Sequence, residues 1–156
     1  MPPSNFMREA IRLSLAGMRR GSGGPFGAVI VRRGEIIARG WNRVTSANDP
    51  TAHAEVVAIR RACRKLGVFH LRDCVLYASC EPCPMCLAAI CWARIPKVYF
   101  ANTHADAAAI GFDDEFFYRE LARPAGRRRL KMKPLLRAEA LVAFEEWRTK
   151  GDKTPY

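Results

Sequence analysis

Three side chains have the types and the spacing of zinc ligands. They are His53 and the pair Cys83 and Cys86, which lie three residues apart in a Cys-Pro-Met-Cys motif. Because residues at this spacing share one face of a helix, both sulfur atoms can reach the same ion. Two thiolates and a neutral imidazole balance the charge of Zn²⁺ and leave the fourth tetrahedral position to water. We therefore expect one zinc ion per subunit, with a catalytic water as its fourth ligand.

Glu55 follows His53 by two residues and is the predicted catalytic acid and base. A carboxylate beside a zinc-activated water can take its proton and later return it to a departing amine. The order His-x-Glu and then Pro-Cys-x-x-Cys, which occurs here at residues 53–55 and 82–86, is typical of zinc-dependent deaminases of nucleobases. The two motifs together predict that water replaces an exocyclic amine of a base.

Cys80 leaves a second interpretation of the metal site open. It extends the motif to Cys80-x-x-Cys83-x-x-Cys86 and could add a third sulfur to a closed, structural zinc site. That site would leave Glu55 without a role. An iron–sulfur cluster is disfavoured because Cys91 follows at the wrong spacing. The remaining cysteines lie in apolar periodic segments and are predicted to be core thiols: Cys63, Cys74 and Cys91.

Two predicted helices would bring the ligands to one point. Helical periodicity extends from His53 to Leu66, and Pro84 suits the first turn of a helix that ends near Arg94. The unpaired amides at a helix N-terminus favour a thiolate over a thiol. Both helices are therefore expected to begin at the ion.

Strands alternate with these helices. Residues 26–31 and 35–44 are predicted to form a hairpin, and residues 74–79 and 97–101 further strands. A first helix is expected from a cap at Ser4 to about Gly21, and another over residues 115–121. The alternation predicts an α/β domain with a mixed sheet, helices on its faces and the site at its edge.

The composition suits one domain, residues 1–156, with 49% hydrophobic and 26% charged residues. No apolar run approaches the roughly 20 residues that span a bilayer, and no secretory signal is recognised, so we expect a cytoplasmic protein without a membrane partner. The net charge of +11 permits nucleic-acid binding, but the basic residues are dispersed along the chain, which favours ordinary solvated surfaces.

Several motifs together resemble the cytidine deaminase-like superfamily and, within it, the bacterial guanine deaminases. The similar segments span nearly the whole chain: residues 23–29, Asn42, residues 49–55, residues 80–86, residues 111–114 and Tyr156.

The resemblance implies a three-layer α/β/α sandwich around a mixed five-stranded sheet, one catalytic zinc and hydrolysis of guanine to xanthine and ammonia. In that family Glu55 would transfer protons, Asn42 would hydrogen-bond the base and Phe26 would stack on it. Asp114 would hold the polar edge of the base. The other predicted substrate-binding residues are Ala54, Trp92 and Tyr156, although core packing explains Trp92 equally well.

The resemblance also implies a homodimer in which residues 150–156 of one subunit, ending at Tyr156, close the site of its neighbour. From the residues alone, this segment is equally well a frayed polar tail.

An acidic pair gives a physical reason to favour guanine. Guanine presents ring and exocyclic N–H donors side by side, so Asp113 or Asp114 can accept from that edge, whereas adenine and cytosine offer an acceptor nitrogen there. Either aspartate could instead cap the helix that follows.

Three alternatives remain open at this stage. The first is a tRNA adenosine deaminase, favoured by the positive charge. The second is a cytosine or guanosine deaminase, which the sequence barely separates from a guanine deaminase. The third is a non-catalytic RNA-binding module stabilised by a zinc ion with four protein ligands.

Overall fold

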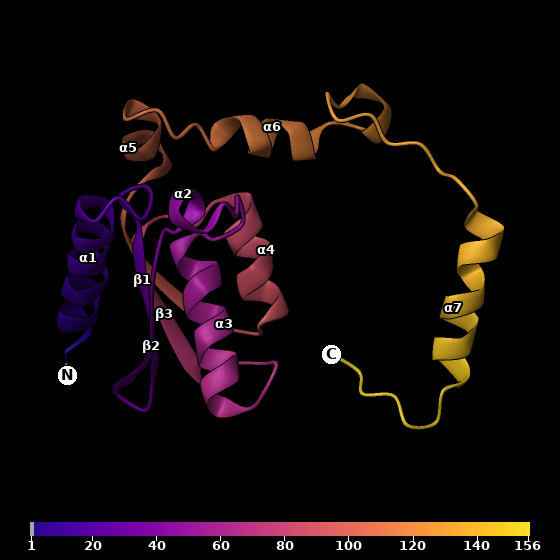
Figure 1. Ribbon diagram of the computed structural model, residues 1–156, viewed down its shortest axis with the longest axis horizontal. Helices are drawn as coiled ribbons and strands as arrows, with labels where there is room; N and C mark the ends of the chain where they lie inside the picture. The colour runs from indigo at the N-terminus through magenta and orange to yellow at the C-terminus, as the bar shows by residue number, and fades with distance from the viewer. Residues whose placement is uncertain (1) are drawn as a thin grey trace. The chain divides into compact units, whose positions relative to one another are not determined.

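A mixed four-stranded sheet organises the first part of the chain. The computed structural model describes residues 2–156, and in these the sheet contains β1 (Gly27–Arg32), β2 (Glu35–Trp41), β3 (Cys74–Cys80) and β4 (Lys97–Asn102) (Figure 1). The strand order is β2-β1-β3-β4. β1 is antiparallel to both β2 and β3, whereas β3 and β4 are parallel.

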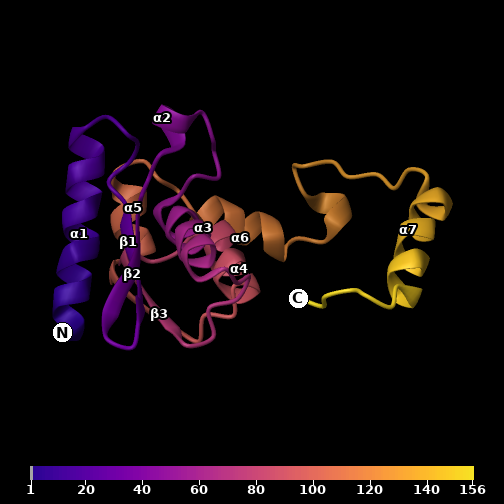
Figure 2. The same ribbon diagram turned by 60° about the horizontal axis from the view of Figure 1, so that its bottom comes forward.

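Helices cover both faces of this sheet. Helix α1 (Pro3–Arg19) lies on one face, and α3 (Ala54–Leu66) and α4 (Pro84–Trp92) lie on the other; the second view shows the same layers (Figure 2). The residues of β1 alternate accordingly. Val29 and Val31 pack with Phe6 and Leu13 of α1, while Ala28 and Ile30 belong to the core beneath α3. This period of two follows from the pleat of a strand and produces the three layers.

Two glycines permit α3 and α1 to approach the sheet closely. A Cβ atom on Gly40 would lie 2.1 Å from the carbonyl oxygen of Ala54 in α3. A Cβ atom on Gly27 would lie 2.2 Å from the carbonyl oxygen of Ala10 in α1. Because the obstacles are backbone atoms, any larger residue would push the layers apart.

The remaining helices are mostly short. They are α2 (Val44–Ala47), α5 (His104–Ala109), α6 (Glu115–Ala122), the 3₁₀ helix η1 (Ala125–Arg127) and α7 (Arg137–Thr149). The chain divides into a first compact unit that ends at Phe117 and a second unit, Tyr118–Tyr156. No helix in the described residues has the length and hydrophobicity needed to cross a membrane.

The predicted hairpin, the two later strands and the helices beginning near 54, 84 and 115 are confirmed, with boundaries shifted by one to three residues. The prediction for the first helix was wrong at its start, whereas its end near Gly21, which has a φ of 70°, is confirmed. The helix begins at Pro3 and places Ser4 within its first turn, because the fixed φ of proline suits that position; it ends at Arg19.

The prediction of a fifth strand was also wrong, because the sheet of the described residues has four strands. After β4 the chain continues in helices and irregular segments. In the segment after α6, the Arg128 side chain donates hydrogen bonds to the carbonyl oxygens of Leu121 and Arg123, and Pro134 has no N–H to donate to a ladder. The two carbonyl groups lie at the C-terminal end of α6, so the arginine completes the end of this helix.

Candidate active site

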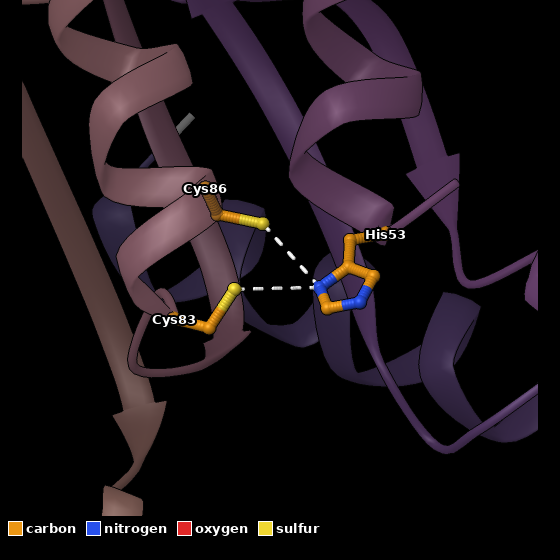
Figure 3. Close-up of side chains that lie close together, drawn as sticks. All are labelled: His53, Cys83 and Cys86. Carbon is orange, nitrogen blue, oxygen red and sulfur yellow. Dashed lines mark hydrogen bonds between the residues drawn. The ribbon is translucent and has the colours of Figure 1, made fainter. Parts of the chain in front are cut away.

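The three predicted ligands come together where α3 and α4 begin. His53 is the N-cap residue of α3, Cys83 is the N-cap residue of α4, and Cys86 lies one turn further along α4. Neither N-cap side chain makes a capping hydrogen bond, so both are directed to the cluster instead. Nδ1 of His53 lies 3.5 Å from Sγ of Cys83 and 3.5 Å from Sγ of Cys86 (Figure 3).

These distances fit a tetrahedral zinc ion. With Zn–S bonds of about 2.3 Å and Zn–N bonds of about 2.0–2.1 Å, tetrahedral angles place sulfur and nitrogen roughly 3.6 Å apart. The ligand atoms of His53, Cys83 and Cys86 all lie within 4.8 Å of one another. The residues present therefore fit zinc, and the number of ligands matches a catalytic site with one open position.

The electrostatics of the two cysteines also favour a cation. Hydrogen bonds from Cys86 and His53 lower the pKa of Cys83 to about 4. The pKa of Cys86 is raised, first by its hydrogen bond with Cys83 and then by burial. Because a second thiolate beside the first is repelled, only a bound dication makes both sulfurs anionic together.

Cys80 lies outside this cluster. Its thiol donates to the carbonyl oxygen of Thr103 over 3.7 Å, and burial raises its pKa to about 11. Within the described residues, the metal cluster consists of His53, Cys83 and Cys86, and a closed site with a third sulfur has no support.

Cys74 is a buried thiol as predicted, and Cys63 is partly buried. Cys91 is exposed, so the prediction that it lies in the core was wrong, because α4 turns this position to the surface.

Glu55 lies in the first turn of α3, beside the cluster. It is one of few buried charged residues, at 7% exposure, and lines the same pocket as His53 and Cys83. Burial raises the pKa of Glu55 to about 7, with the charge of Cys83 acting in the same direction. A carboxyl group with this environment is suited to exchange protons at neutral pH.

A pocket of about 270 Å³ opens beside these residues. Its wall is largely apolar, with a few polar groups that converge on the space. The lining residues are Gly24, Phe26, Gly27, Asn42, Val44, Thr45, Pro50, His53, Glu55, Ala78, Ser79, Cys80, Glu81, Cys83, Phe112 and Asp114.

Asn42 is held in one orientation in this pocket. It is buried, and its side-chain oxygen accepts hydrogen bonds from the backbone N–H groups of Gly24, at 3.3 Å, and Val44, at 3.1 Å. A Cβ atom on Gly23 would lie 2.1 Å from the same oxygen, so the glycine makes room for the amide. The side-chain NH₂ group of Asn42 is therefore the donor that can meet a ligand.

Phe26 forms the apolar side of the pocket together with a residue that the sequence analysis did not single out. The rings of Phe26 and Phe112 meet edge to face with centroids 4.9 Å apart. Phe112 belongs to the 111–114 motif, but it was not among the predicted site residues.

The two aspartates have different roles. Asp113 accepts a hydrogen bond from the backbone N–H of Glu115 over 3.1 Å and so caps α6. Asp114 lines the pocket, and burial and the charge of Cys83 raise its pKa. Beside it, His104 lies between Asp114 and Glu81, and neither His104 nor Glu81 was among the predicted site residues. Glu81 could have been noticed inside the 80–86 motif, whereas no sequence pattern marked His104.

Two predicted substrate-binding residues of the first unit, Ala54 and Trp92, do not line this pocket. Ala54 has its side chain in the core beneath α3, so only its backbone remains for a ligand. Trp92, at the end of α4, is 62% exposed. Tyr156 belongs to the second unit and is 75% exposed in the single chain.

Known proteins resemble the chain over its whole length. Residues 2–102 match the model of the cytidine and deoxycytidylate deaminase zinc-binding region. Guanine deaminase of Bacillus subtilis (strain 168) is 52% identical over 156 residues, which is 100% of either protein. An X-ray structure of guanine deaminase from Bacillus subtilis matches with a TM-score of 0.97 and 52% identity over 100% of this chain and 99% of that chain.

Two further relatives are more distant. The tRNA-specific adenosine deaminase of Aquifex aeolicus (strain VF5) is 45% identical over 96 residues, 62% of this chain and 63% of that protein. The structure of guanine deaminase from Nitrosomonas europaea matches with a TM-score of 0.70 and 32% identity, over 91% of this chain and 72% of that one.

Proposed function

Because the chain belongs to the cytidine and deoxycytidylate deaminase zinc-binding family, we propose that it hydrolyses guanine to xanthine and ammonia in a zinc-dependent reaction. The observation that carries this proposal is the cluster of His53, Cys83 and Cys86 with buried Glu55 beside it, opening on a pocket that contains Asp114. The full-length similarity to a guanine deaminase supports the choice of base.

Glu55 is the group that moves protons. Zinc, when bound by His53, Cys83 and Cys86, supplies a Lewis acid that makes water nucleophilic near neutral pH. Glu55 accepts the proton of the attacking water and delivers protons to ring atom N3 and to the amine that leaves C2. Each transfer requires a short path, which is supported by the presence of Glu55 in the lining of the same pocket as His53 and Cys83.

Asn42, Phe26 and Asp114 orient the base. The NH₂ group of Asn42 donates to an acceptor of the purine, and the ring of Phe26 packs on its face. Asp114 accepts from the N–H donors at the edge that carries the amine. Adenine and cytosine present an acceptor nitrogen at the corresponding place and would be repelled.

The size of the pocket supports a free base. Its volume of about 270 Å³ lies below the roughly 300–1,000 Å³ that accommodate drug-sized ligands. An RNA stem-loop would require an extended basic surface around the opening as well.

The second unit supports the proposal of a homodimer. It contains no buried side chain, although it carries many large apolar ones. The most exposed of these are Leu121, Leu130, Met132, Leu135, Leu136, Val142, Phe144 and Tyr156. Such a surface needs a partner, and we infer that it packs against a second copy of the chain. In this dimer residues 1–156 act as one domain per subunit, and residues 150–156, with Tyr156, close the neighbour's pocket.

The free thiols of the cysteines support a location in a reducing compartment of the cell. All six are unpaired, including the exposed Cys91. Disulfides are rare in the cytoplasm because thiols there are kept reduced, so we place the protein in the cytoplasm.

One assay tests the activity. Ammonia release is measured with guanine, guanosine, cytosine, adenine and a tRNA anticodon stem-loop, and the zinc content is measured on the same sample. We expect turnover of guanine and about one zinc per chain. Inosine formation in the stem-loop without guanine turnover would replace the proposal with a tRNA adenosine deaminase, the activity of the Aquifex aeolicus relative.

A further inference from the structure

His104 links two carboxylates that line the pocket. Its Nε2 lies 3.2 Å from Oε1 of Glu81, and its Nδ1 lies 4.0 Å from Oδ2 of Asp114. Both acids line the pocket, whereas His104 is not among the lining residues found in the described chain. The imidazole therefore stands behind the two acids, where it contacts them without taking the substrate's place.

Hydrogen bonds to neighbouring elements fix the position of His104 in the fold. The second oxygen of Glu81 accepts from the backbone N–H of His104 over 3.2 Å, so one carboxylate contacts both its main chain and its side chain. The backbone N–H of Glu81 donates to Asn102 at the end of β4 over 2.8 Å. Thr103 and Asp106 form a reciprocal capping box that begins α5 at His104. These contacts join His104 to the ends of β3 and β4.

Asp114, in contrast, lies in a loop. It belongs to the connection between α5 and α6, which contains Gly111 at a φ of 93°. Loops are more mobile than the elements they join, and a hydrogen-bond acceptor that selects a substrate needs a fixed position. Phe112 packs this loop on Phe26, and His104 Nδ1 lies at an ion-pair distance of 4.0 Å from the Asp114 carboxylate, too long for a direct hydrogen bond.

Charge supports the same role. Glu81 and Asp114 both line the pocket, and each has a carboxylate oxygen within 4.0 Å of a ring nitrogen of His104. Burial raises the pKa of Asp114, and the charge of His104 acts in the opposite direction and so favours the carboxylate. Without the imidazole, Asp114 would be free to turn towards solvent and would no longer be directed to the base.

We propose that His104 is a positioning residue, which holds Asp114 where it accepts the N–H donors of guanine and thereby contributes to the selection of guanine. The inference rests on the proposed function, because it presupposes that guanine is the substrate. His104 touches neither the base nor the reacting atoms. Its effect is exerted through Asp114.

The test compares guanine with 2-aminopurine, which carries the same C2 amine but has an acceptor at N1 in place of the N–H donor. His104→Ala is expected to lower kcat/KM for guanine on the order of tenfold, mainly through KM, with zinc content unchanged. The KM for 2-aminopurine, or its inhibition constant if it is not turned over, is expected to change less than about threefold. The preference for guanine should therefore fall.

Two conservative variants separate the contacts of the two ring nitrogens. His104→Asn keeps an amide donor near the position of Nδ1, and His104→Gln keeps one near Nε2. We expect His104→Asn to retain more of the preference for guanine than His104→Gln does. His70→Ala, the same substitution in the loop before β3, is the matched control and should leave both substrates unaffected.

An unchanged preference in active His104→Ala would overturn the inference, as would equal losses for both substrates. If the variant does not fold, the comparison of His104→Asn with His104→Gln decides in the same way. A wild-type protein that does not turn over guanine would instead overturn the proposed function itself.

Discussion

The two compact units of the chain use apolar side chains in different ways. The first unit, up to Phe117, contains the buried apolar clusters, which lie on both faces of a four-stranded sheet, although some of its large apolar side chains, such as Trp92 and Phe100, are exposed. The second unit, Tyr118–Tyr156, carries Leu135, Phe144 and other large side chains that remain exposed in the single chain. All lining residues of the pocket beside the metal cluster belong to the first unit.

This difference suggests a division of roles, in which the first unit carries the reactive residues and the second unit mediates association with another subunit. The ligands depend on the start of α3 and the start of α4, which the core holds in place. The second unit lacks a core of its own, so burial of its apolar surface requires a partner. Variants in the two units should therefore change different quantities.

The largest effect is expected at the metal cluster. Cys86→Ala removes one of three ligands and should abolish zinc binding and reduce kcat more than about 1,000-fold, because the nucleophile is no longer activated. Cys91→Ala, an exposed position on the same helix, should retain zinc and activity. Zinc content and ammonia release are measured for both. Full activity of a zinc-free Cys86→Ala protein would contradict the assignment of the cluster.

Glu55→Gln should leave zinc bound and lower kcat by about 100- to 10,000-fold, the range of general acid–base catalysis. The amide keeps the shape of the side chain but cannot accept and return a proton. The exposed Glu35→Gln serves as the control. If Glu55→Gln retained wild-type kcat, another group would have to move the protons.

Deletion of residues 150–156 tests the role proposed for the second unit. We expect kcat/KM for guanine to fall on the order of 100-fold, since Tyr156 would no longer close the neighbour's pocket, while zinc content stays the same. Sedimentation of the full chain should show a dimer. A fully active monomer would contradict both the exchange and the association.

Substitution of one glycine in each unit compares how closely the two units are packed, through the change in the free energy of unfolding. Gly40→Ala places a Cβ atom 2.1 Å from the Ala54 carbonyl oxygen and should destabilise the protein by about 3 kcal/mol. A Cβ atom on Gly151, in the second unit, meets nothing within 4 Å, and Gly151→Ala should change stability by less than about 0.5 kcal/mol. Urea unfolding measures both. Equal effects would mean that the two units pack alike.

The smallest effect concerns the surface of the first unit at low pH. Hydrogen bonds from Arg12 and Arg39 lower the pKa of Glu9 to about 2, below its usual value of 4.5. The contribution to stability is complete above pH 4.5 and is lost as the pH falls towards 2. Because both arginines are substantially exposed, we expect about 1 kcal/mol. Glu9→Gln should remove this part of the acid dependence of the urea midpoint, and an unchanged dependence would show that Glu9 contributes nothing.

The sequence predicts the metal cluster and the central layers because their patterns are local. His53, Cys83 and Cys86 each lie at the beginning of a helix whose start is marked by periodicity or proline, so a short motif fixes the side-chain direction. The hairpin from Gly27 to Trp41 follows from a run of β-branched residues and the turn at Arg33 and Gly34. These elements require no knowledge of distant contacts.

What the sequence does not predict depends on contacts between distant segments. His104 gains its role only because Glu81 and the loop at Asp114 meet it in space. Trp92 was expected in the pocket, yet the start of α4 faces the cluster while its end reaches the surface. The described residues after β4 form helices and irregular segments in place of the expected fifth strand, and Pro134 in this stretch has no N–H to donate to a ladder.

The local structure of the zinc ion tests the central claim most directly. X-ray absorption at the zinc edge of the purified wild-type protein should show two sulfur ligands at about 2.3 Å and two lighter ligands at about 2.0–2.1 Å, one of which exchanges when a base analogue binds. A shell of three sulfurs, a shell closed by protein side chains, or an active protein without zinc would contradict the account.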